Sequence, residues 1–177
     1  QTQCNILYTI IKNEFQNEEL MQKKEYEILK ARKIQHPALI QYLKSRKVYE
    51  QKDLVKEIEY ELNRKKYFGI GFFNNSGGVE IRNKYSKICL GKKDVTLIKN
   101  ELNISNEILI FEGFFDYLTF KKWEKKENLS SDYLILNSTA MFFKVEELLK
   151  GYDKISLFFD NDSNGELIKS KIQNQYK

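Results

Sequence analysis

The chain of 177 residues contains two cysteines, one histidine and one proline. Cys4 and Cys89 lie far apart and form no CxxC pair, which argues against a zinc site and favours a reducing, cytoplasmic location. No apolar run approaches the roughly 20 residues that cross a bilayer, so we expect no membrane partner. The N-terminus lacks the basic and apolar regions of a signal peptide. Because the sequence begins with Gln1 rather than Met, we expect a piece of a longer protein.

Charge is distributed unevenly along the chain, whose net charge is +5. Residues 1–105 contain 20 Lys and Arg against 13 Asp and Glu, whereas residues 106–177 contain 10 against 12. Basic side chains neutralise phosphates and clustered carboxylates bind metal ions, so this division suits a protein that acts on polynucleotides. The same lysine richness is also typical of proteins from AT-rich genomes, and charge alone does not decide between these explanations.

The first 105 residues predict a mixed α+β basic lobe. His36 and Pro37 open a helix, with Pro37 at the first helical position, where its missing N–H costs nothing. Alternation of Ile58, Tyr60 and Leu62 with glutamates predicts a strand. A second strand, a turn rich in Asn, Ser and Gly, and a return strand follow at residues 67–73, 74–78 and 79–84. Residues 1–35 fit helix and strand equally well.

Residues 106–177 predict an α/β domain. Short apolar strands alternate with helices, a pattern typical of a parallel sheet with right-handed crossovers. The expected strands are 107–111, 133–136 and 155–159, and the expected helices are 114–126, 141–150 and 165–175. In such sheets the functional residues gather at the carboxyl ends of the strands.

Acidic residues follow two of these strands: Glu112 and Asp116 follow the first, and Asp160 and Asp162 follow the third. Carboxylates gathered at one sheet edge repel one another unless a cation joins them, and oxygen ligands suit Mg²⁺ or Mn²⁺. Two alternatives remain open. Such residues can cap the next helix. Asp160 could instead begin a calcium loop, although Lys171 stands where an EF-hand requires Glu.

Glu-Gly-x-x-Asp after one strand and Asp-x-Asp after another resemble the Toprim domain, which primases, topoisomerases and some nucleases share. Leu136-Asn137-Ser138-Thr139 matches a small-residue turn between them. Upstream, the segment from His36 to Arg46 resembles the helix that opens the primase core, and residues 67–85 resemble its basic β-lobe. The resemblance is strongest to small zinc-finger and Toprim DNA primases of Bacteroidetes plasmids and mobile elements. It implies a Rossmann-like parallel sheet with helices on both faces.

The resemblance also implies roles for the matched residues. Glu112, Asp160 and Asp162 would be catalytic and would bind Mg²⁺ or Mn²⁺, with Asp116 supporting that site. Arg82, Asn83 and Lys84 would lie along the nucleic-acid groove. The expected activity is nucleotidyl transfer that makes short primers in DNA replication, and the expected partners are single-stranded DNA, nucleoside triphosphates and a replicative helicase.

Two alternatives to a primase remain: a metal-dependent Toprim nuclease, and a non-catalytic module that binds nucleic acid. A topoisomerase is disfavoured, because the chain is short and shows no separate domain for a tyrosine nucleophile. The family's zinc finger is absent, and the sequence ends before the family's final strand and further acidic motif. We therefore expect a truncated Toprim domain, which alone could be inactive.

Overall fold

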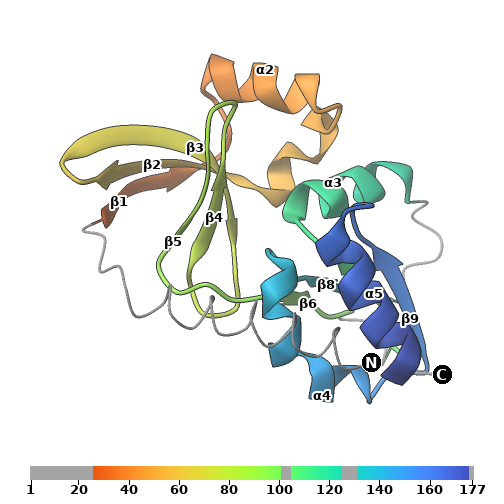
Figure 1. Cartoon of the computed structure of the whole chain (residues 1–177). Helices are drawn as coiled ribbons and strands as arrows, with labels where there is room; N and C mark the ends of the chain where they lie inside the picture. Colours follow the sequence, from red (N-terminus) through yellow and green to blue (C-terminus); the bar gives the residue numbers. More distant parts are fainter. Residues whose placement is uncertain (1–25, 101–104, 125–130, 176–177) are drawn as a thin grey trace. The chain divides into compact units, whose positions relative to one another are not determined.

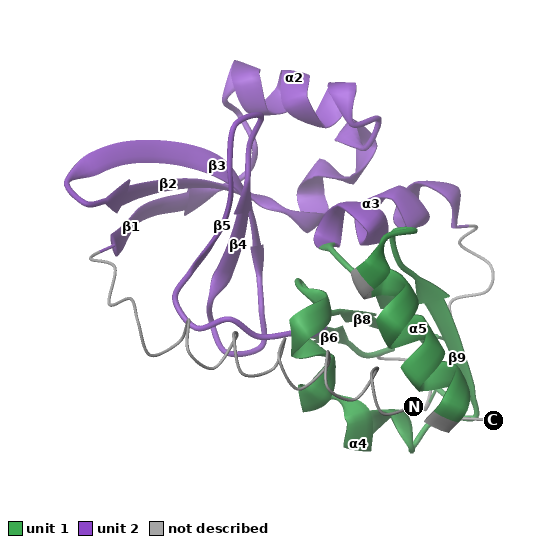
Figure 2. Cartoon of the chain, in the orientation of Figure 1, with its two compact units in different colours: residues 1–23, 97–113, 127–177 green, residues 24–96, 114–126 purple. Residues whose placement is uncertain are grey.

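The computed structural model describes residues 26–100, 105–124 and 131–175, without the side chains of Asn164 and Gln175. Two compact units divide the described residues (Figure 2). One comprises residues 26–96 and 114–124, and the other residues 97–113 and 131–175 apart from the gap at 101–104. The sequence before residue 26 lies outside this description, so its predicted elements are not tested. No helix of the described residues is long and apolar enough to cross a membrane.

The first unit contains a five-stranded antiparallel sheet in the order β1-β2-β3-β4-β5 (Figure 1). The strands are β1 (Tyr26–Arg32), β2 (Lys56–Leu62), β3 (Lys65–Phe73), β4 (Val79–Arg82) and β5 (Lys87–Leu90). Asn63 and Arg64 connect β2 to β3 with φ angles of 52° and 61°. Two successive left-handed residues form the tight turn that suits the twist of a hairpin. Strands β2, β3 and β4 and the loop at 74–78 match the prediction, although β4 ends two residues before its predicted end. Strand β1 shows that residues 26–32 of the ambiguous segment form a strand.

One face of this sheet forms a compact apolar core. Its buried members come from β2, β4 and β5: Ile58, Tyr60, Val79, Ile81 and Leu90. Between them, β3 contributes Gly69 and Gly71. A Cβ on Gly69 would lie 2.5 Å from Ile81 Cγ2, and one on Gly71 would lie 2.3 Å from Ile58 Cγ1. These two glycines therefore let the side chains of β2 and β4 meet above β3, as at the bend of a curled sheet.

Helices pack against the opposite face of the same sheet. Helix α2 (Pro37–Ser45) begins as predicted, and the Nδ1 atom of His36 accepts a hydrogen bond from the Ala38 amide (3.2 Å). A 3₁₀ helix, η1 (Tyr49–Leu54), follows. Helix α3 (Phe114–Trp123) belongs to this unit although it follows a strand of the other sheet in the chain. The ring of Phe114 stacks on Phe72 of β3 with 5.3 Å between centroids.

The second sheet has the order β6-β8-β7-β9, and β7 runs parallel to both β8 and β9. Its strands are β6 (Thr96–Ile98), β7 (Glu107–Phe111), β8 (Asp132–Ile135) and β9 (Lys154–Phe158). The predicted α/β pattern with parallel strands is confirmed. That helices cover both faces stays a prediction, because α3 groups with the other unit.

The helices of the second unit differ from the prediction in two places. Instead of one helix over 141–150, the chain forms a 3₁₀ helix, η3 (Thr139–Lys144), and a single turn, α4 (Glu146–Leu149). Val145 between them has a φ of −114°, which departs from helical geometry. Aromatic and β-branched residues in this stretch lose rotamer freedom in a helix. The last helix, α5 (Ser163–Gln175), is present and begins two residues before its predicted start.

Candidate functional site

The carboxyl ends of β7 and β9 place two of the acidic segments side by side. The two strands are parallel neighbours, with Phe111 opposite Phe158, and the rings of this pair stack 4.9 Å apart. The Glu112 amide donates a hydrogen bond to the Phe158 carbonyl (3.3 Å). Pairing thus extends one residue past both strands, and Glu112 lies beside the segment that leads into Asp160. This is the sheet edge at which the sequence predicts the site.

Glu112 and the two aspartates differ in exposure. Glu112 is partly buried, and its Oε2 atom is inaccessible to solvent. Asp160 and Asp162 are exposed. A buried carboxylate oxygen costs free energy unless a donor, proton or cation compensates it, whereas an exposed one retains its hydration. Of the three acids at this edge, Glu112 therefore depends most on a compensating donor, proton or cation.

Asp162 caps helix α5. Its Oδ1 atom accepts a hydrogen bond from the Gly165 amide (2.8 Å), and its carbonyl accepts one from the Glu166 amide (3.0 Å). Gly165 is required here, because a Cβ would lie 2.2 Å from the Asp160 carbonyl oxygen. The capping alternative raised by the sequence therefore holds for Asp162, and it explains why α5 begins early. The cap bond occupies one of the two carboxylate oxygens.

The donor set at this edge fits a hard divalent cation. Glu112, Asp160 and Asp162 offer only carboxylate oxygens, which suit Mg²⁺ or Mn²⁺ and not zinc. Within the described parts of the chain, no three His, Cys, Asp or Glu side chains lie close enough together to hold an ion. Convergence of these three carboxylates on one metal therefore stays a prediction. Asp116, the fourth predicted ligand, lies in α3 of the other unit, where its charge acts on Arg82.

Arg82, predicted to bind nucleic acid, is half-buried at the end of β4. Its guanidinium carbon lies 5.7 Å from the centroid of the Phe114 ring, a cation–π distance. Burial lowers the pKa of Arg82, while the nearby carboxylates of Glu80 and Asp116 oppose this shift. An arginine remains charged under these conditions. Arg82 therefore packs α3 against the sheet, and part of its charge is already balanced within its own unit.

Asn83 and Lys84 form the turn between β4 and β5 and have different roles. The Nδ2 atom of Asn83 donates to the Phe68 carbonyl (3.0 Å), and Oδ1 accepts from the amides of Tyr85 (2.8 Å) and Ser86 (2.9 Å). Asn83 thus fixes the shape of the turn. Lys84 is exposed, with its Nζ atom 5.6 Å from the centroid of the Tyr85 ring. Of the three predicted residues, Lys84 presents its charge most openly to solvent.

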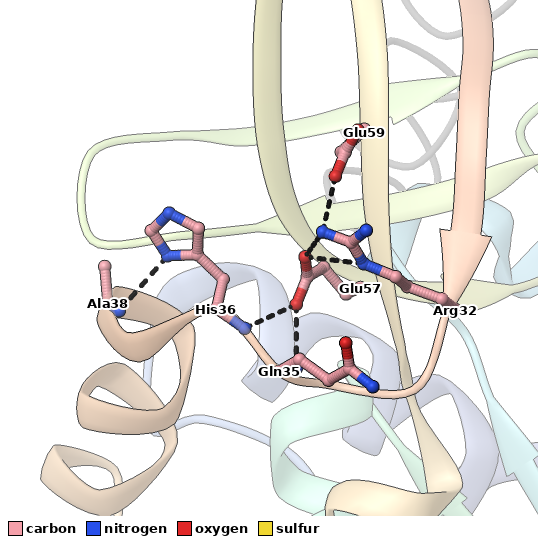
Figure 3. A network of polar contacts seen from close by, with 6 residues as sticks. All are labelled: Arg32, Gln35, His36, Ala38, Glu57 and Glu59. Atoms are coloured by element: carbon pink, nitrogen blue, oxygen red, sulfur yellow. Dashed lines mark hydrogen bonds and ion pairs between the residues drawn. The ribbon is translucent and has the colours of Figure 1, made fainter.

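A buried carboxylate that the sequence did not predict connects β2 to the start of α2 (Figure 3). Glu57 is fully buried. It accepts hydrogen bonds from Arg32 (Nη2, 2.7 Å) and from the amides of Gln35 (2.8 Å) and His36 (2.7 Å). Burial raises the pKa of Glu57, but these hydrogen bonds outweigh burial and lower it below the ordinary value. Alternation in β2 predicted the strand but gave Glu57 no partner, because Arg32 lies in the ambiguous segment.

A second buried acid lies on β4. Glu80 is buried and stands opposite Cys89 of β5. Burial raises the pKa of Glu80, while a hydrogen bond to Cys89 and the charge of Arg82 lower it. Burial also raises the pKa of Cys89, and the charge of Glu80 adds to that shift. Cys89 is therefore an inert thiol at neutral pH.

Comparison with known proteins gives two family matches. Residues 28–91 match the family described as Domain of unknown function (DUF8464), and residues 109–177 match the family described as Toprim-like. Comparison with curated proteins finds no match. Among solved structures, the primase fragment of the bacteriophage T7 primase-helicase protein is similar at 18% identity, with a TM-score of 0.49 over 89% of this chain and 71% of that one. Glu112, Asp160 and Asp162 thus lie in the segment that matches the Toprim-like family.

Proposed function

We propose that this chain is the core of a DNA primase, a metal-dependent nucleotidyltransferase that makes short primers on single-stranded DNA. The observation that supports it most is the adjacency of Glu112 to the end of β9 inside the Toprim-like segment. That arrangement gathers acidic residues at the carboxyl edge of a parallel sheet, where functional residues of α/β folds collect. An antiparallel, lysine-rich unit that precedes it supplies charge for a polyanionic template.

Each group has a separate role in this proposal. Glu112, Asp160 and Asp162 would hold Mg²⁺ or Mn²⁺, which when bound would neutralise phosphate charge and activate an attacking hydroxyl. Asp162 also fixes the start of α5 through its cap hydrogen bond. Lys84 and Arg82 would contact the phosphate backbone. The hydrogen bonds of Asn83 would fix the conformation of the β4–β5 turn. Nucleoside triphosphates and the DNA template are the proposed substrates, with a replicative helicase as a partner. A plasmid or mobile-element origin remains part of the proposal.

The test is primer synthesis on single-stranded DNA with labelled nucleoside triphosphates and either Mg²⁺ or Mn²⁺. The chain is compared with Asp160→Asn and with Asp153→Asn, an exposed aspartate at the opposite end of β9. We expect extension products from the wild type and Asp153→Asn but not from Asp160→Asn. Shortening of the DNA that depends on Asp160 would instead establish the nuclease. If neither reaction occurs while DNA is bound, the chain is a binding module.

A further inference from the structure

The turn between β4 and β5 presents an aromatic side chain that the fold does not use. Tyr85 is 88% exposed, so its ring contributes little to any core. The turn that holds it is nevertheless well defined, because the Asn83 side chain hydrogen-bonds the amides of Tyr85 and Ser86 and the carbonyl of Phe68. A ring held by a firm turn can contact a ligand without the cost of first ordering the turn.

Two further rings flank this turn on β3. Tyr67 stacks on buried Tyr60 (5.5 Å between centroids) and is still 42% exposed. Phe68 packs against His36 (4.1 Å) and is 37% exposed. Each ring packs against a neighbouring ring and is also partly exposed to solvent. As neighbours in one strand, they face opposite sides of the sheet, so one ligand that crosses Tyr85 can reach one of them.

Basic side chains predominate around these rings, although Glu59 and Glu61 of β2 lie opposite Phe68 and Lys66. Residues 63–68 and 83–87 contain five Lys or Arg and no Asp or Glu. The five are Arg64, Lys65, Lys66, Lys84 and Lys87, all of them exposed. The nearest acid across from Phe68 is Glu59, which is paired with Arg32 (2.6 Å). Open aromatic rings among predominantly basic side chains suit a ligand with flat rings and a negatively charged backbone.

We propose that this surface, defined as Tyr67, Phe68, Lys84, Tyr85 and Lys87, binds single-stranded DNA by stacking a base on Tyr85 while the lysines contact adjacent phosphates. The inference rests on the proposed function in taking DNA as the ligand, and it adds a stacking site made of residues other than the carboxylates. Duplex DNA keeps its bases stacked inside the helix, so the surface discriminates between the two forms. Through this surface the chain binds template bases without a metal ion.

Helix α3 provides a matched control. Trp123 is 75% exposed, and the Nζ atom of Lys122 lies 5.6 Å from its ring, as Lys84 does from Tyr85. Trp123 lies in the same unit but outside the proposed surface. Replacing either ring with alanine removes an exposed aromatic group beside a lysine, so only the position differs.

The experiment measures fluorescence anisotropy of a labelled oligonucleotide of about 10 nucleotides, within the usual site size for such proteins. EDTA is present, so metal binding plays no part. We expect Tyr85→Ala to weaken binding at least about five-fold, the effect of losing one stacked base, and Tyr85→Phe and Trp123→Ala to bind as the wild type does. An oligonucleotide of abasic residues should bind wild type and Tyr85→Ala equally.

Two results would overturn the inference: unchanged binding by Tyr85→Ala, or an equal loss on the abasic oligonucleotide. Unchanged thermal unfolding of Tyr85→Ala excludes a folding defect, as expected for so exposed a residue. Asp160→Asn is measured alongside. If it loses primer synthesis but binds DNA normally, while Tyr85→Ala behaves as wild type, the stacking site fails and the proposed function stands. If the wild type makes no primers and Tyr85→Ala weakens DNA binding, the proposed function fails and the stacking site stands.

Discussion

The backbone amide of Glu112 donates to the carbonyl oxygen of Phe158, and this single contact brings two acidic segments to one edge of a parallel sheet. Glu112 follows β7 directly, and Asp160 follows β9 by two residues. Carboxylates at neighbouring strand ends repel one another unless a cation lies between them. The stability of this unit should therefore depend on divalent metal, and the dependence can be measured without any assumption about the reaction.

The first prediction concerns that dependence. Mn²⁺ should raise the melting temperature of the wild type, because an ion that binds only the folded state stabilises it by mass action. At a hundred times its dissociation constant the ion would add about 2.7 kcal/mol. Asp160→Asn should lose most of this rise, since the amide is nearly isosteric but uncharged. Asp153→Asn should keep it. Identical melting of wild type and Asp160→Asn at every Mn²⁺ concentration would contradict a metal site.

The second prediction separates the two roles of Asp162. Asn is as good a helix cap as Asp, whereas Ala is not. Without metal, Asp162→Ala should therefore lower the free energy of unfolding by about 1 kcal/mol, and Asp162→Asn should leave it nearly unchanged. Both variants should weaken the response to Mn²⁺, because both lose the charge. Urea titrations with and without Mn²⁺ measure the two effects. A full Mn²⁺ response in Asp162→Asn would show that this residue only caps α5.

Much of the second unit could be predicted from the sequence because its signals are local. The short apolar runs that form β7, β8 and β9 are bounded by turn residues, and parallel pairing follows from their alternation with helices. Gly165 stands at the start of the last expected helix, 165–175. Its requirement comes from the Asp160 carbonyl, 2.2 Å from where a Cβ would be. A close approach between backbone atoms leaves no periodic signal in a sequence.

The contacts of the first unit were harder to predict because they join distant residues. Alternation in β2 places Glu57, Glu59 and Glu61 on one face, and from this pattern the sequence predicted only a strand. Glu57 is buried, because residues 32–36 supply it with a guanidinium and two amides. The half-burial of Arg82 likewise depends on α3, which the sequence placed with the other sheet. Partners that meet only in the tertiary fold cannot be inferred from spacing along the chain.

The third prediction concerns Glu57 and pH. Its pKa is lowered in the folded state. The unfolded chain therefore binds more protons near the ordinary value of about 4.3, so stability rises with pH there. The contribution is fully present above that value and is lost as pH falls through the lower folded pKa. Glu57→Gln should flatten the acid side of a stability–pH curve measured by urea unfolding.

Truncating the same side chain tests its structural role. Glu57→Ala leaves two amides and part of a guanidinium without their acceptor, so we expect a loss of about 2–4 kcal/mol at pH 7. Glu61→Ala, on the same face of β2 but partly exposed, is the control and should change stability by less than about 0.5 kcal/mol. Equal effects of the two variants would mean that the hydrogen bonds of Glu57 add nothing beyond a surface carboxylate.

The last prediction distinguishes Lys84 from Arg82 in DNA binding. A lysine that neutralises one phosphate contributes about one unit to the slope of log K against log salt, because it releases a counterion. Lys84 is exposed at the turn, so Lys84→Gln should reduce that slope by about one unit and leave thermal stability unchanged.

Arg82 is half-buried against Phe114, so Arg82→Gln should lower stability by about 1 kcal/mol through lost cation–π packing. Its salt slope should fall by less than that of Lys84→Gln, since Glu80 and Asp116 already balance part of the charge. Lys150→Gln, where the lysine of the second unit is paired with Glu147, is the control for non-specific charge loss. A slope unchanged by Lys84→Gln, or reduced equally by Lys150→Gln, would show that the β4–β5 turn makes no specific phosphate contact.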